Sequence, residues 1–171
     1  MLKRIVCILF TGLVIAVPPA SASAGDESKL SEGQKGKRAG FAPIKATPKR
    51  PIPSDETMRC PEWHPLFRKY GLPVQVFSYI AWRESRCRPD AVNATWDRHG
   101  RMTYHLNRNK SWDSGLVQVN SSWVRSVRAV CGVNTGDTRR DLRVLLDPEC
   151  NVRFARWIMD NTKGGLGNWG L

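Results

Sequence analysis

The hydrophobic pattern of the second half of the chain predicts helices separated by turns. A first helix begins near Pro61, a residue that suits the first helical turn, and Gly71 ends it. A second helix begins at Pro73 and ends before Pro89, because proline disfavours helical backbone at the residue that precedes it. Their apolar positions at helical spacing are Trp63, Leu66, Phe67, Tyr70, Val76, Phe77, Ile80 and Ala81.

The rest of this part of the chain predicts two more helices and a small β element. Aromatic and polar residues alternate around a turn near Gly100, which predicts a β-hairpin or meander over residues 95–111. Residues 115–120 fit a short strand or a turn. Ser121 or Ser122 can cap the next helix, and a last helix covers residues 150–161. Between them, residues 142–146 fit a short helix or a turn. The expected fold class is α+β and mostly helical, with a small β-hairpin element.

The N-terminus has the pattern of a secretory signal. Two basic residues precede an apolar run over residues 5–17, and small residues follow over residues 20–24. The run is shorter than the ~20 residues of a membrane-spanning helix. We therefore expect residues 1–24 to be a signal peptide cleaved near Ala22 or Ala24, with an uncleaved anchor as the alternative. The protein would then be secreted and act outside the cytoplasm, in a periplasm or cell wall.

Residues 25–58 contain several prolines and few large apolar residues. Such a segment buries too little apolar surface to offset the entropy of ordering the chain. The sequence therefore predicts a disordered linker over residues 25–58 and a folded domain over residues 59–171.

Five cysteines become four once the signal is removed, because Cys7 lies in the apolar run. Four cysteines in an oxidising compartment allow three pairings. We favour two disulfides, Cys60–Cys87 and Cys131–Cys150, because each closes a short loop. The cysteines form no C-x-x-C pair and the three histidines lack ligand spacing. We therefore expect neither a metal nor a cofactor.

Composition and charge narrow the choice of partner. The chain has 171 residues, of which 41% are hydrophobic and 25% charged, typical of a soluble globular protein and not of a multi-pass membrane protein. It carries 27 Lys or Arg and 15 Asp or Glu, a net charge of +12. Residues 59–171 hold 18 of these basic and 10 of these acidic residues, a net +8. This favours a polyanionic partner. The candidates are a nucleic acid, an anionic membrane and an acidic cell wall. No nucleic-acid recognition motif is present, and the predicted signal directs the chain out of the cell. We expect binding to anionic cell-wall polymers through this charge, and we expect a monomer.

Glu84 is the candidate acid of the second helix. One turn beyond Ile80 and Ala81, the apolar face of that helix reaches Glu84. Burial disfavours a charged carboxylate, so such a group can hold a proton near neutral pH and act as a general acid. The alternative is a structural ion pair with Arg83, Arg86 or Arg88. Spacing alone leaves both interpretations open.

Two segments carry a resemblance to a known family. Residues 81–93 read A-W-R-E-S-R-C-R-P-D-A-V-N, and residues 114–120 read S-G-L-V-Q-V-N. They resemble the E-S-x-F-x-P-x-A-x-(S/N) and G-L-M-Q-I-N blocks of the lytic transglycosylase SLT and goose-type lysozyme-like superfamily. The resemblance covers roughly residues 60–160. It implies a lysozyme-like fold that cleaves the β-1,4 bond between N-acetylmuramic acid and N-acetylglucosamine in peptidoglycan. It also implies that Glu84 is catalytic and that Gly115, Gln118 and Asn120 belong to the sugar site.

The second block is also similar to a segment of chicken-type lysozymes. Residues 111–123 read S-W-D-S-G-L-V-Q-V-N-S-S-W, against T-D-Y-G-I-L-Q-I-N-S-R-W in those enzymes. The resemblance places Asp113 on their second catalytic carboxylate; a turn-capping aspartate is the equally weighted alternative. If Asp113 faces Glu84, hydrolysis to a reducing end is expected, since glycosidases commonly use two carboxylates. If Asp113 is not a second catalytic carboxylate, the resemblance implies the family's reaction, in which a 1,6-anhydro ring forms with help from the N-acetyl group of the substrate.

Aromatic residues supply candidate contacts to sugar rings. Trp96, Tyr104 and Trp112 lie in or near the predicted hairpin and are assigned to the cleft. Three other tryptophans at helical positions are assigned to the core: Trp82, Trp123 and Trp157. The resemblance implies that the segment around Trp169 closes one side of the cleft.

Three hypotheses follow. The first is a secreted lytic transglycosylase with Glu84 as general acid and base. The second is a hydrolytic lysozyme that uses Glu84 together with Asp113. The third is a non-catalytic basic protein that binds the cell wall.

Overall fold

The computed structural model describes residues 41–99, 101–105 and 107–171; within β1 and β2 it describes the backbone alone. The predicted signal peptide, the linker up to residue 40, and Gly100 at the hairpin turn lie outside the described residues. No helix in the described part of the chain is long and apolar enough to cross a membrane.

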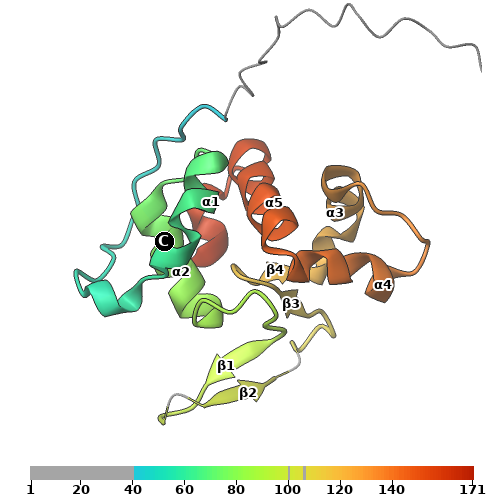
Figure 1. The fold of residues 1–171 in the computed structure, drawn as a ribbon. Coiled ribbons are helices and arrows are strands. Elements are labelled where there is room, and N and C mark those ends of the chain that lie inside the picture. Colours follow the sequence, from blue (N-terminus) through green and yellow to red (C-terminus); the bar gives the residue numbers. More distant parts are fainter. Residues whose placement is uncertain (1–40, 100, 106) are drawn as a thin grey trace, which may run out of the picture. The chain divides into compact units, whose positions relative to one another are not determined.

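Helices make up about half of the described residues, and α5 lies in the middle of them (Figure 1). α5 contacts α1 on one side and α3 on the other. Phe67 of α1, Phe77 of α2 and Phe154 of α5 are fully buried in the core between them. The helices are α1 (His64–Lys69), α2 (Val74–Ser85), α3 (Val124–Cys131), α4 (Thr138–Leu142) and α5 (Pro148–Asn161). Among the described residues, short 3-10 helices lie before, between and after them: η1 (Glu56–Met58), η2 (Pro61–Trp63), η3 (Ser121–Trp123), η4 (Arg143–Leu146) and η5 (Gly165–Trp169).

The first two predicted helices are confirmed, but the second ends earlier than expected. The backbone of Gly71, just past α1, has a φ of +61°, which glycine adopts at little cost. α2 ends at Ser85 because Arg86 takes the left-handed conformation that terminates many helices. Pro89 therefore lies beyond the end of α2 and is not what stops it.

Two antiparallel strand pairs form the β part. β1 (Ala94–Trp96) pairs with β2 (Met102–Tyr104), with Trp96 opposite Met102, which confirms the predicted hairpin. β3 (Asp113–Ser114) pairs with β4 (Val119–Asn120) around a tight turn over residues 115–118. Val92 bridges to Ser114, so β3 has a neighbour on each side. The β1–β2 hairpin extends below the helices in Figure 1.

Two details of the α3–α4 region differ from the sequence prediction. Asn120 caps η3, the 3-10 helix that leads into α3, and its side chain accepts from the backbone N–H of Ser122; neither Ser121 nor Ser122 is the cap. α4 was not predicted from the hydrophobic pattern. Its sequence signal is Asp137, which accepts from the backbone N–H of Arg140 at 2.7 Å.

Both expected disulfides are present. Cys60–Cys87 joins the start of the domain to the residues just after α2, and Cys131–Cys150 joins the end of α3 to α5. The fold class is therefore the expected α+β arrangement with two disulfides.

Part of the segment predicted as linker lies against the domain. The backbone N–H of Ile44 donates to Gly71 O at 2.7 Å, and Arg156 donates to Ala42 O at 2.6 Å. Ile44 and Ile52 pack against the core, and Phe41 contacts the ring of Tyr70. The described structure thus includes ordered chain from residue 41, ahead of the expected boundary at residue 59.

Candidate active site

Glu84 stands on the last turn of α2, where neighbouring bonds hold the helix in place. Ser85 is fully buried, and its hydroxyl lies within hydrogen-bonding distance of two carbonyl oxygens, Ala81 O at 2.9 Å and Leu116 O at 2.7 Å. The second contact ties α2 to the turn between β3 and β4. The Glu84 side chain remains 27% exposed, so it is largely desolvated but still reachable.

Arg83 is the arginine that pairs with Glu84. Its Nε and Nη2 donate to Oε1 of Glu84 at 3.0 and 2.6 Å. The other expected partners lie elsewhere: Arg86 stacks over Trp82 at 3.8 Å, and Arg88 pairs with Asp90. Oε2 of Glu84 accepts no hydrogen bond from the residues that the structure describes. The ion pair therefore leaves one carboxyl oxygen available.

Burial raises the pKa of Glu84 above the usual value of a glutamate. The hydrogen bonds and charge of Arg83 act in the opposite direction, and the negative charge of Asp113 raises the pKa further. Desolvation is the largest of these effects. A carboxyl group with a raised pKa keeps its proton at higher pH, which is the property that a general acid requires.

Asp113 lies on β3, close enough to Glu84 for its charge to act on that group. Its two carboxylate oxygens each accept from a side-chain amide. Asn107 donates to Oδ2 at 2.9 Å and Asn120 donates to Oδ1 at 2.7 Å. Among the described residues the carboxylate accepts from these two side-chain amides and from no backbone N–H, and its charge acts on the candidate acid. Asn107 was not identified from the sequence.

Asn93 fixes the backbone of Asp113. Its Oδ1 accepts from the N–H of Asp113 at 2.8 Å, and its own N–H donates to Asp113 O at 2.8 Å. Asn93 is the last residue of the first motif, so these bonds join the two motif segments. The spacing of the two motif segments along the sequence could not show that they are in contact.

Gly115 and Gln118 shape the turn next to Asp113. The Gln118 amide donates to Ala91 O at 3.0 Å and to Gly115 O at 2.9 Å. Gly115 is buried with a φ of +81°, and the position of its absent Cβ meets Leu145 O and the Asn151 side chain. The contacts of Gly115 are therefore with the core behind the turn, and its role in the sugar site stays a prediction.

A small cavity of about 110 Å³ lies beside these residues. Asp113, Gln118 and Asn120 line it together with Trp123, Asn168 and Trp169. Trp123, assigned to the core from its spacing, packs against Phe154 and Trp157 on one side and reaches the cavity on the other. The sequence feature that could have placed Trp123 at the cavity is its position at the end of residues 111–123, the segment similar to chicken-type lysozymes.

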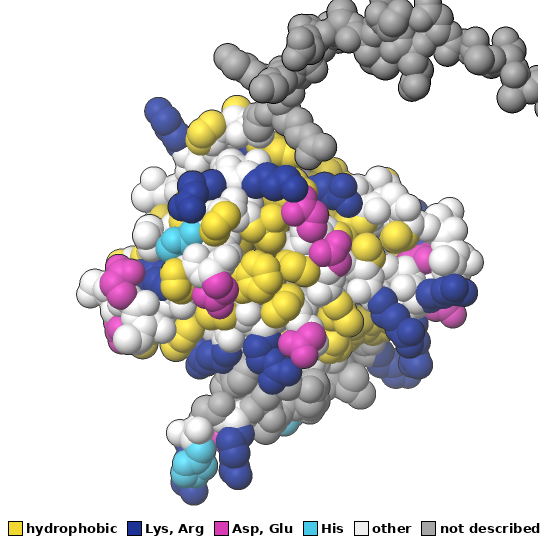
Figure 2. Space-filling view, in the orientation of Figure 1, with side chains coloured by type: hydrophobic (Ala, Val, Ile, Leu, Met, Phe, Trp, Pro, Cys, Tyr) yellow, Lys and Arg dark blue, Asp and Glu magenta, His cyan; other side chains and the backbone are white. Residues whose placement is uncertain are grey.

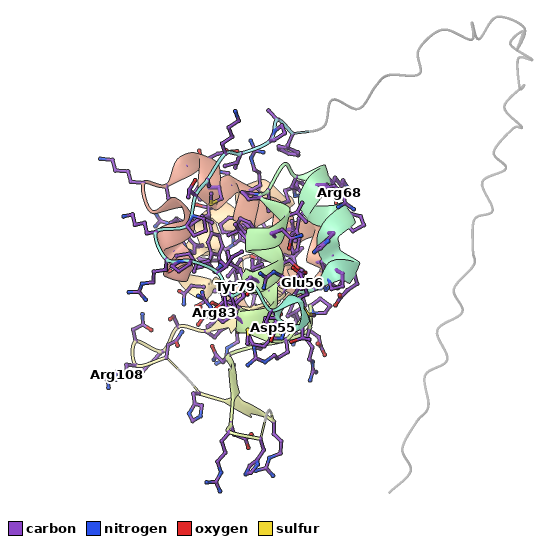
Figure 3. The ribbon with its side chains drawn as sticks, turned by 90° about the vertical axis from the view of Figure 1, so that its left-hand side faces the viewer. Asp55, Glu56, Arg68, Tyr79, Arg83 and Arg108 are labelled. Carbon is purple, nitrogen blue, oxygen red and sulfur yellow. A yellow bond between two sulfur atoms is a disulfide. The ribbon has the colours of Figure 1, made fainter. Side chains whose placement is uncertain are left out.

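The C-terminal segment is tied to both motifs. Trp169 donates from Nε1 to Val117 O at 2.9 Å, and its carbonyl accepts from Arg83 Nη2. Arg83 therefore joins Glu84 to the C-terminal segment. Figure 3 shows Arg83 beside Tyr79 on α2, and the guanidinium carbon lies 5.7 Å from the Tyr79 ring centre.

The other aromatic candidates lie in different places. Trp112 is partly exposed on the far side of β3 from Asp113 and lines another cavity. The side chains of Trp96 and Tyr104 lie outside the described part of the structure, so their assignments stay predictions. Trp82 and Trp157 pack against the core, as expected.

One group of potential metal ligands occurs among the described residues: Cys60, Glu62 and Cys87. Both sulfur atoms are joined in a disulfide, so neither is a thiolate that could bind a metal ion.

Comparison with known proteins agrees with this geometry. The family model "Transglycosylase SLT domain" matches residues 63–171, which is more than half of the chain. No curated protein and no solved structure matched. The matched segment contains α2 with Glu84, the turn after Asp113, and the C-terminal segment that Arg83 binds. The chain belongs to the transglycosylase SLT domain family, whose members act on peptidoglycan.

Proposed function

We propose that the protein is a lytic transglycosylase that cleaves the N-acetylmuramic acid–β-1,4–N-acetylglucosamine bond of peptidoglycan, with Glu84 as general acid and base. The observation that carries this proposal is a partly exposed carboxyl group with a raised pKa in an SLT domain, within the electrostatic reach of Asp113, which lines a cavity. The signal-like N-terminus supports action outside the cytoplasm, where peptidoglycan lies.

Glu84 begins the proposed reaction in its protonated form. It donates its proton to the glycosidic oxygen, the bond from that oxygen to C1 breaks, and N-acetylglucosamine leaves with a free 4-hydroxyl. The N-acetyl oxygen of the muramic acid stabilises C1 during this step. Glu84, now a carboxylate, removes the proton of the C6 hydroxyl, and O6 bonds to C1. The products are a 1,6-anhydro end and a regenerated acid, with no water consumed.

A second candidate is hydrolysis with Asp113 as the second carboxylate. The observation that favours it is the charge of Asp113 acting on Glu84, with the Asp113 carboxylate held by two amides. Asp113 would stabilise the positive charge that develops at C1, and Glu84 would activate a water molecule. Reducing ends would then replace anhydro ends.

Mass spectrometry of peptidoglycan digested by the protein tests both candidates. We expect anhydro-muropeptides from the wild-type protein and at least about a 100-fold slower release from Glu84→Gln, which cannot donate the proton. Glu56→Gln is the matched control, because Glu56 is an exposed residue of η1 without an ion pair among the described residues. Asp113→Asn separates the candidates: it should retain anhydro products in the first and abolish reducing products in the second. Wild-type release by Glu84→Gln would contradict both.

A further inference from the structure

A second cavity, of about 390 Å³, lies on the other face of β3 from Asp113. Successive residues of a strand point to opposite faces. Trp112 and Ser114 line this second cavity, whereas Asp113 between them lines the cavity at the active site. The two cavities are therefore separated by a single strand. Val92, Asn93 and Ser114 of the two motif segments form one wall of the second cavity, and the α4–η4 segment forms the other.

The second cavity combines an apolar lining with basic residues. Its apolar side chains come from the strand region and from the α4–η4 segment: Val92, Trp112, Leu142 and Leu146. Asn93 and Ser114 add polar groups to the lining, and the basic residues Arg139 of α4 and Arg143 of η4 are both exposed. Figure 2 shows Lys and Arg side chains gathered around α4 beside hydrophobic surface. A ligand that fits must carry both apolar groups and negative charge.

The two arginines have no structural partner within the described part of the chain. Neither Arg139 nor Arg143 makes a side-chain ion pair or hydrogen bond there. They are four residues apart, a spacing at which like charges on a helix repel each other. Arg128 shows the contrasting structural case, because it pairs at 2.7 Å with the buried Asp141 of the same segment. Two unpaired guanidinium groups beside an apolar cavity fit an anionic ligand better than a structural role.

We propose that this cavity binds the peptide stem of peptidoglycan, with Arg139 and Arg143 on its terminal carboxylate. Arginine binds carboxylates through paired hydrogen bonds, and alanine methyl groups of the stem suit a floor of Trp112 and Leu142. The inference rests on the proposed function, because it takes the ligand from the polymer that Glu84 would cleave. An extended stem of four residues spans about 13 Å from the sugar backbone to its terminal carboxylate.

A phosphate polymer is the less suitable ligand for this cavity. Phosphate groups would use the two arginines but leave the apolar lining of Trp112, Leu142 and Leu146 without a partner. The stem peptide uses both parts of the lining. An oligomer of glycerol phosphate is therefore the informative competing probe.

Calorimetric titration of the full chain with a synthetic stem tetrapeptide tests the proposal. We expect the peptide with a free terminal carboxylate to bind at least about tenfold more tightly than its terminal amide, since the amide lacks the charge. Arg139→Gln and Arg143→Gln should each weaken binding of the free acid by about tenfold. Arg68→Gln is the matched control: Arg68 is an exposed residue of α1, on the other side of α5 from α4 (Figure 1), and should bind as the wild type does.

Three outcomes would overturn the proposal: no binding of the peptide to the wild-type protein, equal binding of acid and amide, or binding of glycerol phosphate oligomer alone. Circular dichroism of each variant checks that the fold is retained. The proposed function has a separate readout. Product release without peptide binding overturns only the peptide site, whereas peptide binding without product release supports the site and overturns the proposed enzymatic function.

Discussion

At the scale of single residues, the protonation of Glu84 decides when the proposed reaction can start. Its acid form is the one that donates the proton, and burial raises the pKa of this group. A raised pKa means that the acid form persists to higher pH and is lost as the pH rises through that pKa. The rate should therefore fall on the alkaline side at a pH above the usual titration range of a glutamate.

Asp113→Asn and Arg83→Gln should move this alkaline limit in opposite directions. Asp113 raises the pKa of Glu84 through its negative charge, so removing that charge shifts the limit to lower pH. Arg83 lowers the pKa of Glu84, so its removal shifts the limit to higher pH. Product release measured across pH for the wild type and both variants checks the signs. Shifts in the same direction would contradict the arrangement of charges around Glu84.

At the scale of elements, the β3–β4 turn depends on close packing against α5. Asn151 is fully buried in α5; its side chain accepts from Val117 N at 3.0 Å and donates to Ser114 O at 2.9 Å. Gly115 lies between these bonds, where a Cβ would meet Leu145 O and the Asn151 amide. Contacts with Asn151 and Leu145 thus fix the turn between Asp113 and Gln118 on the side that faces the core.

Gly115→Ala should therefore lower the free energy of unfolding by roughly 2–4 kcal/mol, from left-handed backbone together with overpacking. Gly132→Ala is the matched control. Gly132 also has a positive φ, of +70°, but no atom lies within 4 Å of its absent Cβ, so only the backbone cost of about 1–2 kcal/mol applies. Denaturant unfolding of both variants measures the difference. Equal losses would show that the contact with Asn151 does not constrain the turn.

The segment before α1 is held by contacts from a distant helix. Arg156 of α5 donates to Ala42 O at 2.6 Å and to Tyr70 O at 2.9 Å, and its guanidinium lies over the Phe41 ring. Arg156→Ala should release this segment, since hydrogen bonds from charged groups contribute about 1.5–3 kcal/mol.

Amide hydrogen exchange at Ile44, whose N–H donates to Gly71 O, measures the release of that segment. We expect faster exchange at Ile44 in Arg156→Ala and no change in Arg125→Ala, an exposed residue of α3. Unchanged exchange in both variants would show that Arg156 does not hold the segment.

Local sequence signals predicted much of the fold, and long-range contacts account for the differences. Proline, glycine and apolar spacing located α1, α2 and α5, and the alternation around Gly100 located the hairpin. The sequence predicted a disordered linker that included residues 41–58, whereas the structure shows this segment packed against the domain. The few apolar residues of the segment can be buried only because distant helices provide a surface for them. Arg83 presents the same difficulty: its bond to the Trp169 carbonyl spans 86 positions of sequence. Residues 81–93 indicated Glu84 and residues 111–123 indicated Asp113, but neither segment indicated how amide side chains hold Asp113.

At the scale of the whole molecule, excess positive charge should add to whatever binding the sugar site provides. Residues 59–171 carry a net +8, and the arginines of α4 and η4 are exposed. Net positive charge of this kind concentrates a protein on an anionic polymer, but it does not determine which glycosidic bond is cleaved. The interaction is screened by salt, since the Debye length falls from about 10 Å at 0.1 M to about 3 Å at 1 M.

Binding of the Glu84→Gln protein to purified cell walls separates charge from sugar recognition, because this variant should leave the polymer uncut. We expect wall binding to weaken at least about tenfold between roughly 0.05 and 0.5 M salt, as screening removes the long-range attraction. Binding to an uncharged N-acetylglucosamine oligomer should change little over the same range, since stacking and hydrogen bonds at the cavity beside Asp113 do not depend on net charge. Wall binding that is insensitive to salt would show that the sugar site alone retains the protein on its substrate. The positive charge of the domain would then have no part in binding.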